Sequence, residues 1–196
     1  AFAGASGCPP LLGVQSMRPQ AWTEQHNCLE INKRIYEFVK ENRVPSVMLI
    51  GRWSYYTGGT VRPEELNALR PEGSTEDPDR ESSARTLAYG LGKVIDAYRA
   101  IGVKVYVVED NPQQFYGPWK ALRKARKPSD DFINQVAIKS EENSKNQSVA
   151  SKILRKQASH KAQLIDLNGA FCTSSRCPLV DHGNFLYYDA DHLSVA

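Results

Sequence analysis

The sequence predicts an α/β fold in which a parallel β-sheet lies between helices on both of its faces. Three short apolar runs without alternation, at residues 46–51, 103–108 and 162–167, are typical of strands buried on both sides. Stretches with helical periodicity separate these runs, and strands that alternate with helices favour parallel pairing. The length of 196 residues suits one domain, at the usual ~100–200 residues per domain. We therefore expect a single domain over residues 1–196.

The first part of the chain is expected to supply a strand, a helix and a second strand. Residues 1–7 are small and apolar and lead into Cys8-Pro9-Pro10, which predicts a short buried strand ending in a rigid loop. A helix is expected over residues 23–42, because Thr23 offers N-terminal capping chemistry and apolar side chains then recur at helical spacing. The run at residues 46–51 follows as the next strand.

The middle of the chain combines an exposed excursion with a regular helix. Residues 57–83 are rich in Gly, Pro, Glu and Asp, which indicates a loop-rich insertion with a turn of helix at residues 63–69. An apolar stripe over residues 83–100 predicts a helix, and Gly102 lies where a helix C-terminal cap is expected. Residues 103–108 then form a buried strand.

The last part of the chain continues the alternation. Residues 129–160 are polar and compatible with helix, and a strand at residues 162–167 and a short one at residues 185–188 are expected to complete the sheet. In such sheets the ligand lies beyond the carboxyl ends of the strands. This rule directs attention to four segments, at residues 6–7, 51–53, 109–111 and 189–192.

Composition and charge exclude several classes of protein. Hydrophobic residues make up 41% of the chain, which excludes a disordered tail. Lys and Arg number 25 against 22 Asp and Glu, and this net charge of +3 does not indicate a nucleic-acid-binding protein. The basic stretch at residues 120–127 is expected to be a solvated helix face, with attraction to a polyanionic glycan or an anionic lipid as the alternative. No apolar run reaches the ~18–20 residues of a membrane-spanning helix.

The four cysteines form two pairs that are local in the sequence, Cys8 with Cys28 and Cys172 with Cys177. Neither pair has the spacing of a zinc site, in which cysteines usually lie about two to four residues apart. We favour disulfides over free thiols, and the local pairing is the simplest of the three that are possible. Two disulfides would place the domain in an oxidising compartment, such as the periplasm or the cell exterior.

The strongest chemical signal is Asp189, which precedes His192 by three residues. On a turn that leaves a strand, the carboxylate can fold back and accept a hydrogen bond from one imidazole nitrogen while the other nitrogen faces a cleft. This is the orienting acid and the base of a nucleophilic triad. The side chain of Asp191 is expected to diverge, so the role is assigned to Asp189. By itself, the spacing also suits a surface turn or a metal pair.

Four segments together resemble the SGNH domains that are fused to bacterial membrane acyltransferases, namely Cys8-Pro9-Pro10, residues 49–56, the pair Cys172 and Cys177, and residues 188–194. Those proteins O-acetylate cell-surface polysaccharides such as lipopolysaccharide O-antigen. The resemblance spans the chain and implies a three-layer α/β/α fold, a periplasmic domain of an inner-membrane protein and serine-type acyl transfer. It implies a glycan acceptor, an acyl donor and a fused transmembrane domain. We expect no cofactor, no metal and no nucleic-acid partner.

The sequence departs from the family pattern at the nucleophile. The family's serine lies in a Gly-Asp-Ser motif after the first strand, and no such motif occurs in residues 1–196. We therefore expect the segment to lack that first strand and the nucleophile turn, and to be catalytically silent by itself. It also ends four residues after His192, where the family continues into a helix.

The residues expected around an oxyanion form a second departure. The family uses a Gly after the second strand and an Asn after the third. Gly7 matches the former as a backbone N–H donor, whereas Arg52 and Trp53 stand where the Asn is expected. Arg52 is interpreted either as a donor to an oxyanion or an anionic substrate group, or as a guanidinium tied to the sheet edge or stacked on Trp53.

Two further groups allow two interpretations each. The aromatic side chains of Trp53, Tyr55 and Tyr56 suit stacking on sugar rings or ordinary loop packing. The pair Asp110-Asn111 suits a substrate contact or an Asn-Pro turn.

The leading hypothesis is a periplasmic acetyltransferase domain that moves an acetyl group to a glycan hydroxyl through an acyl-serine. In this hypothesis Asp189 orients His192, which acts as base and then as acid. A carbohydrate esterase would run the same half-reaction to water, and a non-catalytic glycan-binding module is a rival of another class. The two enzymes differ only in whether water or sugar reaches the acyl-enzyme, so both stay open.

Overall fold

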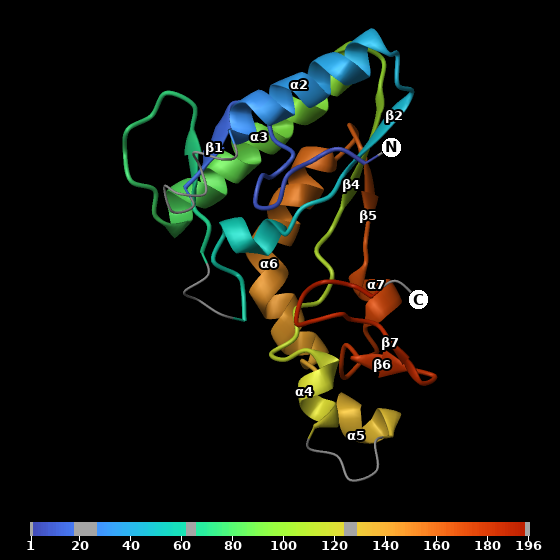
Figure 1. The fold of residues 1–196 in the computed structure, drawn as a ribbon. Helices are drawn as coiled ribbons and strands as arrows, with labels where there is room; N and C mark the ends of the chain where they lie inside the picture. Colours follow the sequence, from blue (N-terminus) through green and yellow to red (C-terminus); the bar gives the residue numbers. More distant parts are fainter. Residues whose placement is uncertain (1, 18–26, 62–65, 124–128, 195–196) are drawn as a thin grey trace.

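A computed structural model describes residues 2–17, 27–61, 66–123 and 129–194 (Figure 1). Its central sheet has three parallel strands in the order β2 (Ser46–Leu49), β4 (Lys104–Val108) and β5 (Gln163–Ile165). Each strand lies within one of the three predicted apolar runs. The expected α/β class with a parallel sheet is therefore confirmed.

Two long helices pack on the sheet from one side. Helix α3 (Arg80–Ala100) lies between β2 and β4 in the chain, and α6 (Ser140–Ala158) lies between β4 and β5. Because both crossovers advance in the same direction along the sheet, right-handed connections place both helices on the same side (Figure 1). The main core forms where they meet each other and the strands, and it includes Leu87, Leu91, Ile95, Val105, Val107 and Leu154.

Helix α2 (Cys28–Glu41) runs beside α3 (Figure 1). It begins at Cys28 because the side chain of Asn27 accepts a hydrogen bond from the backbone N–H of Glu30, which is an N-terminal cap. The cap expected at Thr23 falls outside the described residues. The ring centroids of Tyr36 and Tyr98 lie 5.5 Å apart and join α2 to α3.

An antiparallel ribbon of β1 (Val14–Ser16) and β3 (Leu69–Pro71) packs against α3 and corrects two expectations. Residues 2–7 form no strand, because their Ala, Gly and Ser side chains offer little apolar area to bury. The turn of helix expected at residues 63–69 falls partly outside the described residues, and Leu69 lies instead in β3, where it is fully buried.

Strand β2 is an edge strand of this sheet, and the expectation that it is buried on both faces is wrong. Val47 and Leu49 point to the main core, whereas Met48 and Ile50 are exposed. Alternate side chains of a strand point to opposite faces, so only one face of β2 is covered. A continuous apolar run shows that the side chains of a strand are apolar, but it does not show whether other elements cover both faces of that strand. The expectation was wrong for this reason.

A smaller region lies below the sheet in Figure 1, and we call it the lower region. It is formed by residues 113–123, 129–138 and 168–194, and it contains α4 (Pro118–Leu122), α5 (Asp130–Asn134), α7 (Asn168–Phe171), β6 (Val180–Asp181) and β7 (Asn184–Phe185). The helical stretch expected over residues 129–160 is therefore divided between α5 and α6.

The strand expected at residues 185–188 does not join the parallel sheet. Strand β7 pairs with β6 in an antiparallel hairpin instead. Its two-residue loop consists of His182 and Gly183, whose φ angles of 48° and 78° are both positive. Two positive φ angles define the type I′ turn that closes tight hairpins, so the local turn decides the pairing of this segment.

Both expected disulfides are present. Cys8 is bonded to Cys28, which ties the segment before β1 to the first turn of α2. Cys172 is bonded to Cys177 and closes the loop between α7 and β6. Among the described residues, no helix is both long and apolar enough to cross a membrane.

Candidate active site

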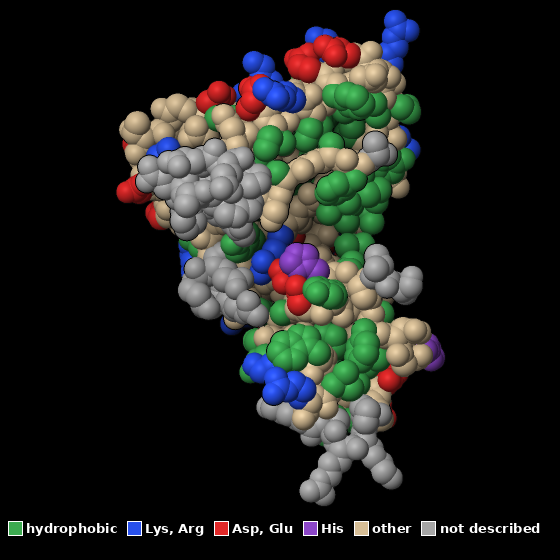
Figure 2. All heavy atoms as spheres, in the orientation of Figure 1, with side chains coloured by type: hydrophobic (Ala, Val, Ile, Leu, Met, Phe, Trp, Pro, Cys, Tyr) green, Lys and Arg blue, Asp and Glu red, His purple; other side chains and the backbone are tan. Residues whose placement is uncertain are grey.

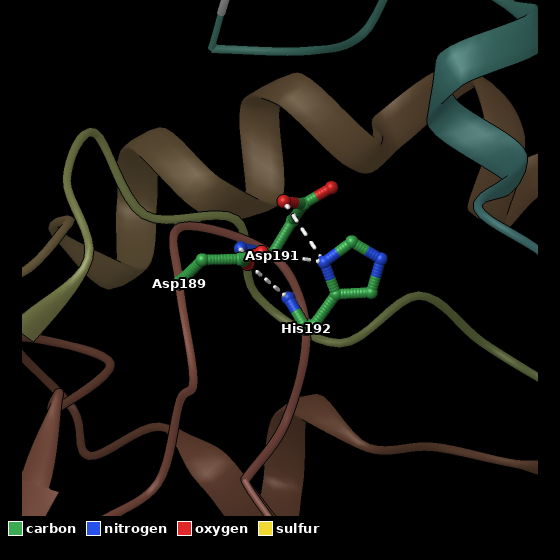
Figure 3. Close-up of side chains that lie close together, drawn as sticks. All are labelled: Asp189, Asp191 and His192. Carbon is green, nitrogen blue, oxygen red and sulfur yellow. Dashed lines mark hydrogen bonds and ion pairs between the residues drawn. The ribbon is translucent and has the colours of Figure 1, made fainter.

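Asp189 and His192 lie on one turn of the lower region (Figure 3). The backbone N–H of Tyr188 donates to the carbonyl of His192 at 2.9 Å and closes this turn. Inside it, Oδ1 of Asp189 accepts hydrogen bonds from the backbone N–H groups of Asp191 at 2.9 Å and of His192 at 2.8 Å. An Asp side chain that accepts from the backbone just ahead of it forms an Asx turn, so Asp189 shapes the loop that carries it.

The turn brings the carboxylate and the imidazole into contact. Oδ2 of Asp189 lies 2.8 Å from Nδ1 of His192. The His192 side chain is 74% exposed, and Figure 3 shows its second ring nitrogen pointing away from the carboxylates. One nitrogen of the ring is thus held by Asp189, while Nε2 is presented outward.

Hydrogen bonding keeps the Asp189 carboxylate charged. Partial burial by itself would raise the pKa of Asp189, but the backbone N–H groups of Asp191 and His192 and the His192 side chain lower this pKa to about 2. At neutral pH a charged carboxylate can only accept a hydrogen bond. Asp189 therefore favours the tautomer in which Nδ1 of His192 carries the proton and Nε2 is the acceptor.

Asp191 diverges less than expected. Its Oδ1 lies 3.6 Å from Nδ1 of His192, which is too far for a good hydrogen bond, while its Oδ2 is paired with Nη1 of Arg52 at 2.7 Å. Burial raises the pKa of Asp191, and the nearby charge of Arg52 opposes that rise. Arg52 thus holds the second carboxylate, and Asp189 is the closer partner of the histidine.

Arg52 connects the loop after β2 to the His192 turn. In addition to the Asp191 pair, its guanidinium carbon lies 4.7 Å from the ring centroid of Tyr55. The amide oxygen of Gln113, when oriented to accept, lies 2.6 Å from Nε of Arg52. The stacking partner is therefore Tyr55 and not Trp53, and the guanidinium is tied to the C-terminal turn. A direct contact of Arg52 with an oxyanion or with an anionic group of the substrate stays a prediction.

Trp53 is fully buried, and its side chain therefore presents no exposed face to a substrate in this structure. Its backbone N–H donates to Oδ1 of Asp110 at 2.6 Å, and its indole Nε1 donates to the carbonyl of Val108 at 2.6 Å. Tyr56 is buried as well, which favours ordinary packing over stacking on a sugar ring for both aromatic side chains.

Asp110 caps the short helix η1 (Trp53–Tyr56), because its Oδ2 also accepts from the backbone N–H of Ser54 at 2.7 Å. Burial raises the pKa of Asp110 to about 6, even though these N–H groups favour the charged form. The two carboxylate oxygens are engaged by backbone donors, which favours a structural role over a substrate contact.

Two residues after β4 support the His192 turn from a distance along the chain. The side-chain Nδ2 of Asn111 donates to the carbonyl of Asp191 at 3.0 Å, and the backbone N–H of Gln114 donates to the carbonyl of Ala190 at 2.7 Å. The carboxyl end of β4 thus meets the turn, as expected for an α/β crevice. No local signal reveals this contact, since 80 positions separate Asn111 from Asp191.

The hydrogen-bond partners of Gly7 lie outside the His192 turn. Its carbonyl accepts from Oη of Tyr56 and from Nδ2 of Asn67, each at 3.4 Å. The described hydrogen bonds do not join Gly7 to the His192 turn. The role expected for its backbone N–H stays a prediction.

The same turn offers the ligands of a metal ion. One ligand atom each from Asp189, Asp191 and His192 lies within 4.8 Å of the others. However, Asp191 is paired with Arg52, and Asp189 accepts three hydrogen bonds within the turn. These contacts suit proton transfer by the histidine better than metal binding.

Comparisons with known proteins agree with the fold. A family model described as "SGNH domain (fused to AT3 domains)" matches residues 1–196. The periplasmic domain of a lipopolysaccharide acetyltransferase from Salmonella ser. Paratyphi A is structurally similar, with a TM-score of 0.56 and 17% sequence identity over 95% of this chain. The chain spans 62% of that solved chain, which is less than two thirds of its length. No curated protein matches the sequence.

Proposed function

The chain belongs to the SGNH domains that are fused to AT3 domains, and from this premise we propose that it serves periplasmic O-acetylation of a cell-surface glycan. The contact between Asp189 and His192 carries the proposal. A histidine whose Nδ1 is held by a carboxylate and whose Nε2 faces outward is equipped to take a proton from an attacking hydroxyl.

The proposed chemistry has two half-reactions. In the first, Nε2 of His192 removes the proton of a serine hydroxyl while the serine oxygen attacks the acyl carbonyl, and the proton then passes to the departing donor group. In the second, Nε2 removes the proton of a glycan hydroxyl, whose oxygen takes over the acetyl group, and the proton returns to the serine. Asp189 stabilises the imidazolium in both steps because its carboxylate stays charged.

The serine itself is proposed to come from a segment outside residues 1–196. The family's Gly-Asp-Ser does not occur in this sequence. Ser54, which lies near Arg52, is fully buried and cannot reach a substrate. The domain would accordingly supply the acid and the base of the site.

The family and the cysteines support the proposed compartment and partners. All four cysteines are in disulfides, which persist in oxidising compartments such as the periplasm. The proposed partners are a glycan acceptor, an acyl donor and a fused membrane acyltransferase domain. A carbohydrate esterase would use the same dyad with water as the acceptor.

The decisive experiment measures the acetyl content of the surface polysaccharide in cells that carry variants of the full-length protein. We expect His192→Ala to reduce acetylation to background at unchanged protein level, because the exposed imidazole contributes little to packing. Asp189→Asn should cost as much or less. Asp191→Asn should cost far less, because this side chain is paired with Arg52.

His182 provides a matched control, since its Nε2 lies 3.8 Å from Oδ1 of Asp181 and its side chain is 92% exposed. His182→Asn keeps a residue that tolerates the positive φ and should leave acetylation unchanged. Wild-type acetylation in His192→Ala would refute the proposal. Release of free acetate by the purified protein, unaffected by added glycan, would instead identify an esterase.

A further inference from the structure

Three exposed aromatic side chains beside the His192 turn take no part in the proposed proton transfer. The exposed fraction is 43% for Tyr116, 52% for Trp119 and 78% for Tyr188. Single exposed aromatic residues are ordinary, but a group of them on one face marks a contact surface. We call these three side chains the aromatic platform.

Gly117 places the platform against the dyad. A Cβ atom at this position would lie 2.9 Å from Nε1 of Trp119 and 3.1 Å from Cα of Asp189. The indole and the main chain of Asp189 therefore meet at Gly117, and Tyr188 directly precedes Asp189 in the turn. Figure 2 shows hydrophobic side chains gathered next to the acidic and histidine side chains on one face of the molecule.

Positive charge borders the platform. Nζ of Lys120 lies 3.8 Å from the ring centroid of Tyr116. Arg123 is exposed just after α4, one helical turn beyond Trp119, and its backbone N–H donates to the carbonyl of Trp119 at 3.1 Å. A cation at this distance is attracted to the face of the ring, so Lys120 stays beside the aromatic surface. The surface thus combines flat apolar faces with a cationic edge.

We propose that the aromatic platform, with Lys120 and Arg123, binds an acidic sugar residue of the glycan and holds it beside His192. The apolar C–H face of a sugar ring packs on an aromatic face, while the Tyr hydroxyl and the Trp N–H bond the sugar hydroxyls. A carboxylate on the sugar pairs with the cationic edge. The inference rests on the proposed function and names the class of its acceptor.

A lipid surface is the main competing occupant of such a patch, since Trp, Tyr and Lys also gather at membrane interfaces. An interfacial helix needs a long apolar face, however, and α4 has only five residues. Within the platform, two of the three aromatic side chains are tyrosines with polar tips. These features favour a hydroxyl-rich ring over acyl chains.

The first experiment measures binding to the full-length protein by calorimetry, without any acyl donor. The probes are a hexuronic-acid hexasaccharide, a neutral glucose hexasaccharide of the same length, and vesicles of anionic phospholipid. We expect the acidic oligosaccharide to bind, and the neutral one to bind at least tenfold more weakly. Equal binding of both saccharides, or binding of vesicles alone, would overturn the proposal.

Variants assign the binding to the platform. Trp119→Ala should weaken binding of the acidic oligosaccharide by about tenfold, as expected for the loss of an aromatic anchor, whereas Trp119→Phe should retain most of it. Tyr89→Ala is the control, because Tyr89 on α3 is 53% exposed and also has a lysine, Lys93, over its ring. Equal losses in Trp119→Ala and Tyr89→Ala, or no loss in Trp119→Ala, would contradict the site.

Acetylation kinetics separate this inference from the proposed function. Trp119→Ala should raise KM for the glycan with little change in kcat, while His192→Ala should abolish kcat and still bind the acidic oligosaccharide. If His192→Ala acetylates normally but Trp119→Ala loses binding, the platform stands and the proposed catalysis fails. If only His192→Ala has an effect, the catalysis stands and the platform fails.

Discussion

The sheet region and the lower region differ in what holds them together. Between α3, α6 and the strands, a continuous set of aliphatic and aromatic side chains is buried. The lower region buries a smaller apolar cluster that includes Ile133, Leu179 and Tyr187. Its segments are joined largely by amide side chains, for example Oδ1 of Asn134, which accepts from the backbone N–H groups of Leu179 at 2.8 Å and Val180 at 3.2 Å.

Gln114, which is fully buried, also joins segments of the lower region through its amide group. Its Nε2 donates to the carbonyl of Cys177 at 2.8 Å, and its Oε1 accepts from the backbone N–H of Ile138 at 3.0 Å. Hydrogen bonds are directional, whereas apolar burial is not. The arrangement of segments in the lower region, which contains the dyad, therefore depends on the geometry of hydrogen bonds. The sheet region depends mainly on the burial of apolar area.

The largest effect on stability is expected in the sheet region. Leu91→Ala removes a fully buried side chain between helix and sheet and should lower the free energy of unfolding by about 3 kcal/mol. The whole domain should unfold earlier in denaturant, and hydrogen exchange should accelerate in both regions. A loss below about 1 kcal/mol would contradict the dominance of apolar burial here.

A smaller and more local effect is expected for Gln114→Ala. This change leaves the N–H of Ile138 and the carbonyl of Cys177 without their partners and should cost about 2 kcal/mol. Hydrogen exchange should accelerate at Ile138 and in the His192 turn while the strands stay protected. Gln163→Ala at an exposed position of β5 is the control. Uniform acceleration in Gln114→Ala would show that the two regions open as one.

The smallest expected effect is on how the free energy of unfolding depends on pH, and this dependence differs between Asp189 and Asp110. The pKa of Asp189 is lowered to about 2, so its contribution to stability is present above the unfolded value of about 3.9 and is lost as pH falls toward 2. Burial raises the pKa of Asp110 to about 6, so its contribution is present below about 3.9 and is lost as pH rises through 6.

The check is the free energy of unfolding as a function of pH for two variants. Asp189→Asn should remove the part of the slope below about pH 4, and Asp110→Asn should remove the opposing part between about pH 4 and 6. If either substitution left its own pH interval unchanged, the environment assigned to that carboxylate would be wrong.

The same division explains what the sequence could predict. The apolar runs at β2, β4 and β5 and the stripe of α3 were predictable because burial leaves a local pattern. Asp189 and His192 were predictable because they lie within one turn. The contacts of Asp191 with Arg52 and Asn111 join distant segments and leave no pattern in composition or spacing. The pairing of β7 was missed because the turn at His182 and Gly183 outweighs the apolar content of the strand.

The two oxygens of Asp189 have separate tasks, since Oδ1 accepts from the backbone and Oδ2 faces His192. An asparagine has the same outline but only one acceptor. If its oxygen kept the backbone bonds, its NH₂ group would face Nδ1, and the ring proton would have to move to Nε2. The loop would survive while the histidine turned from a base into a donor. One carboxylate therefore sets both the shape of the turn and the direction in which protons travel through it.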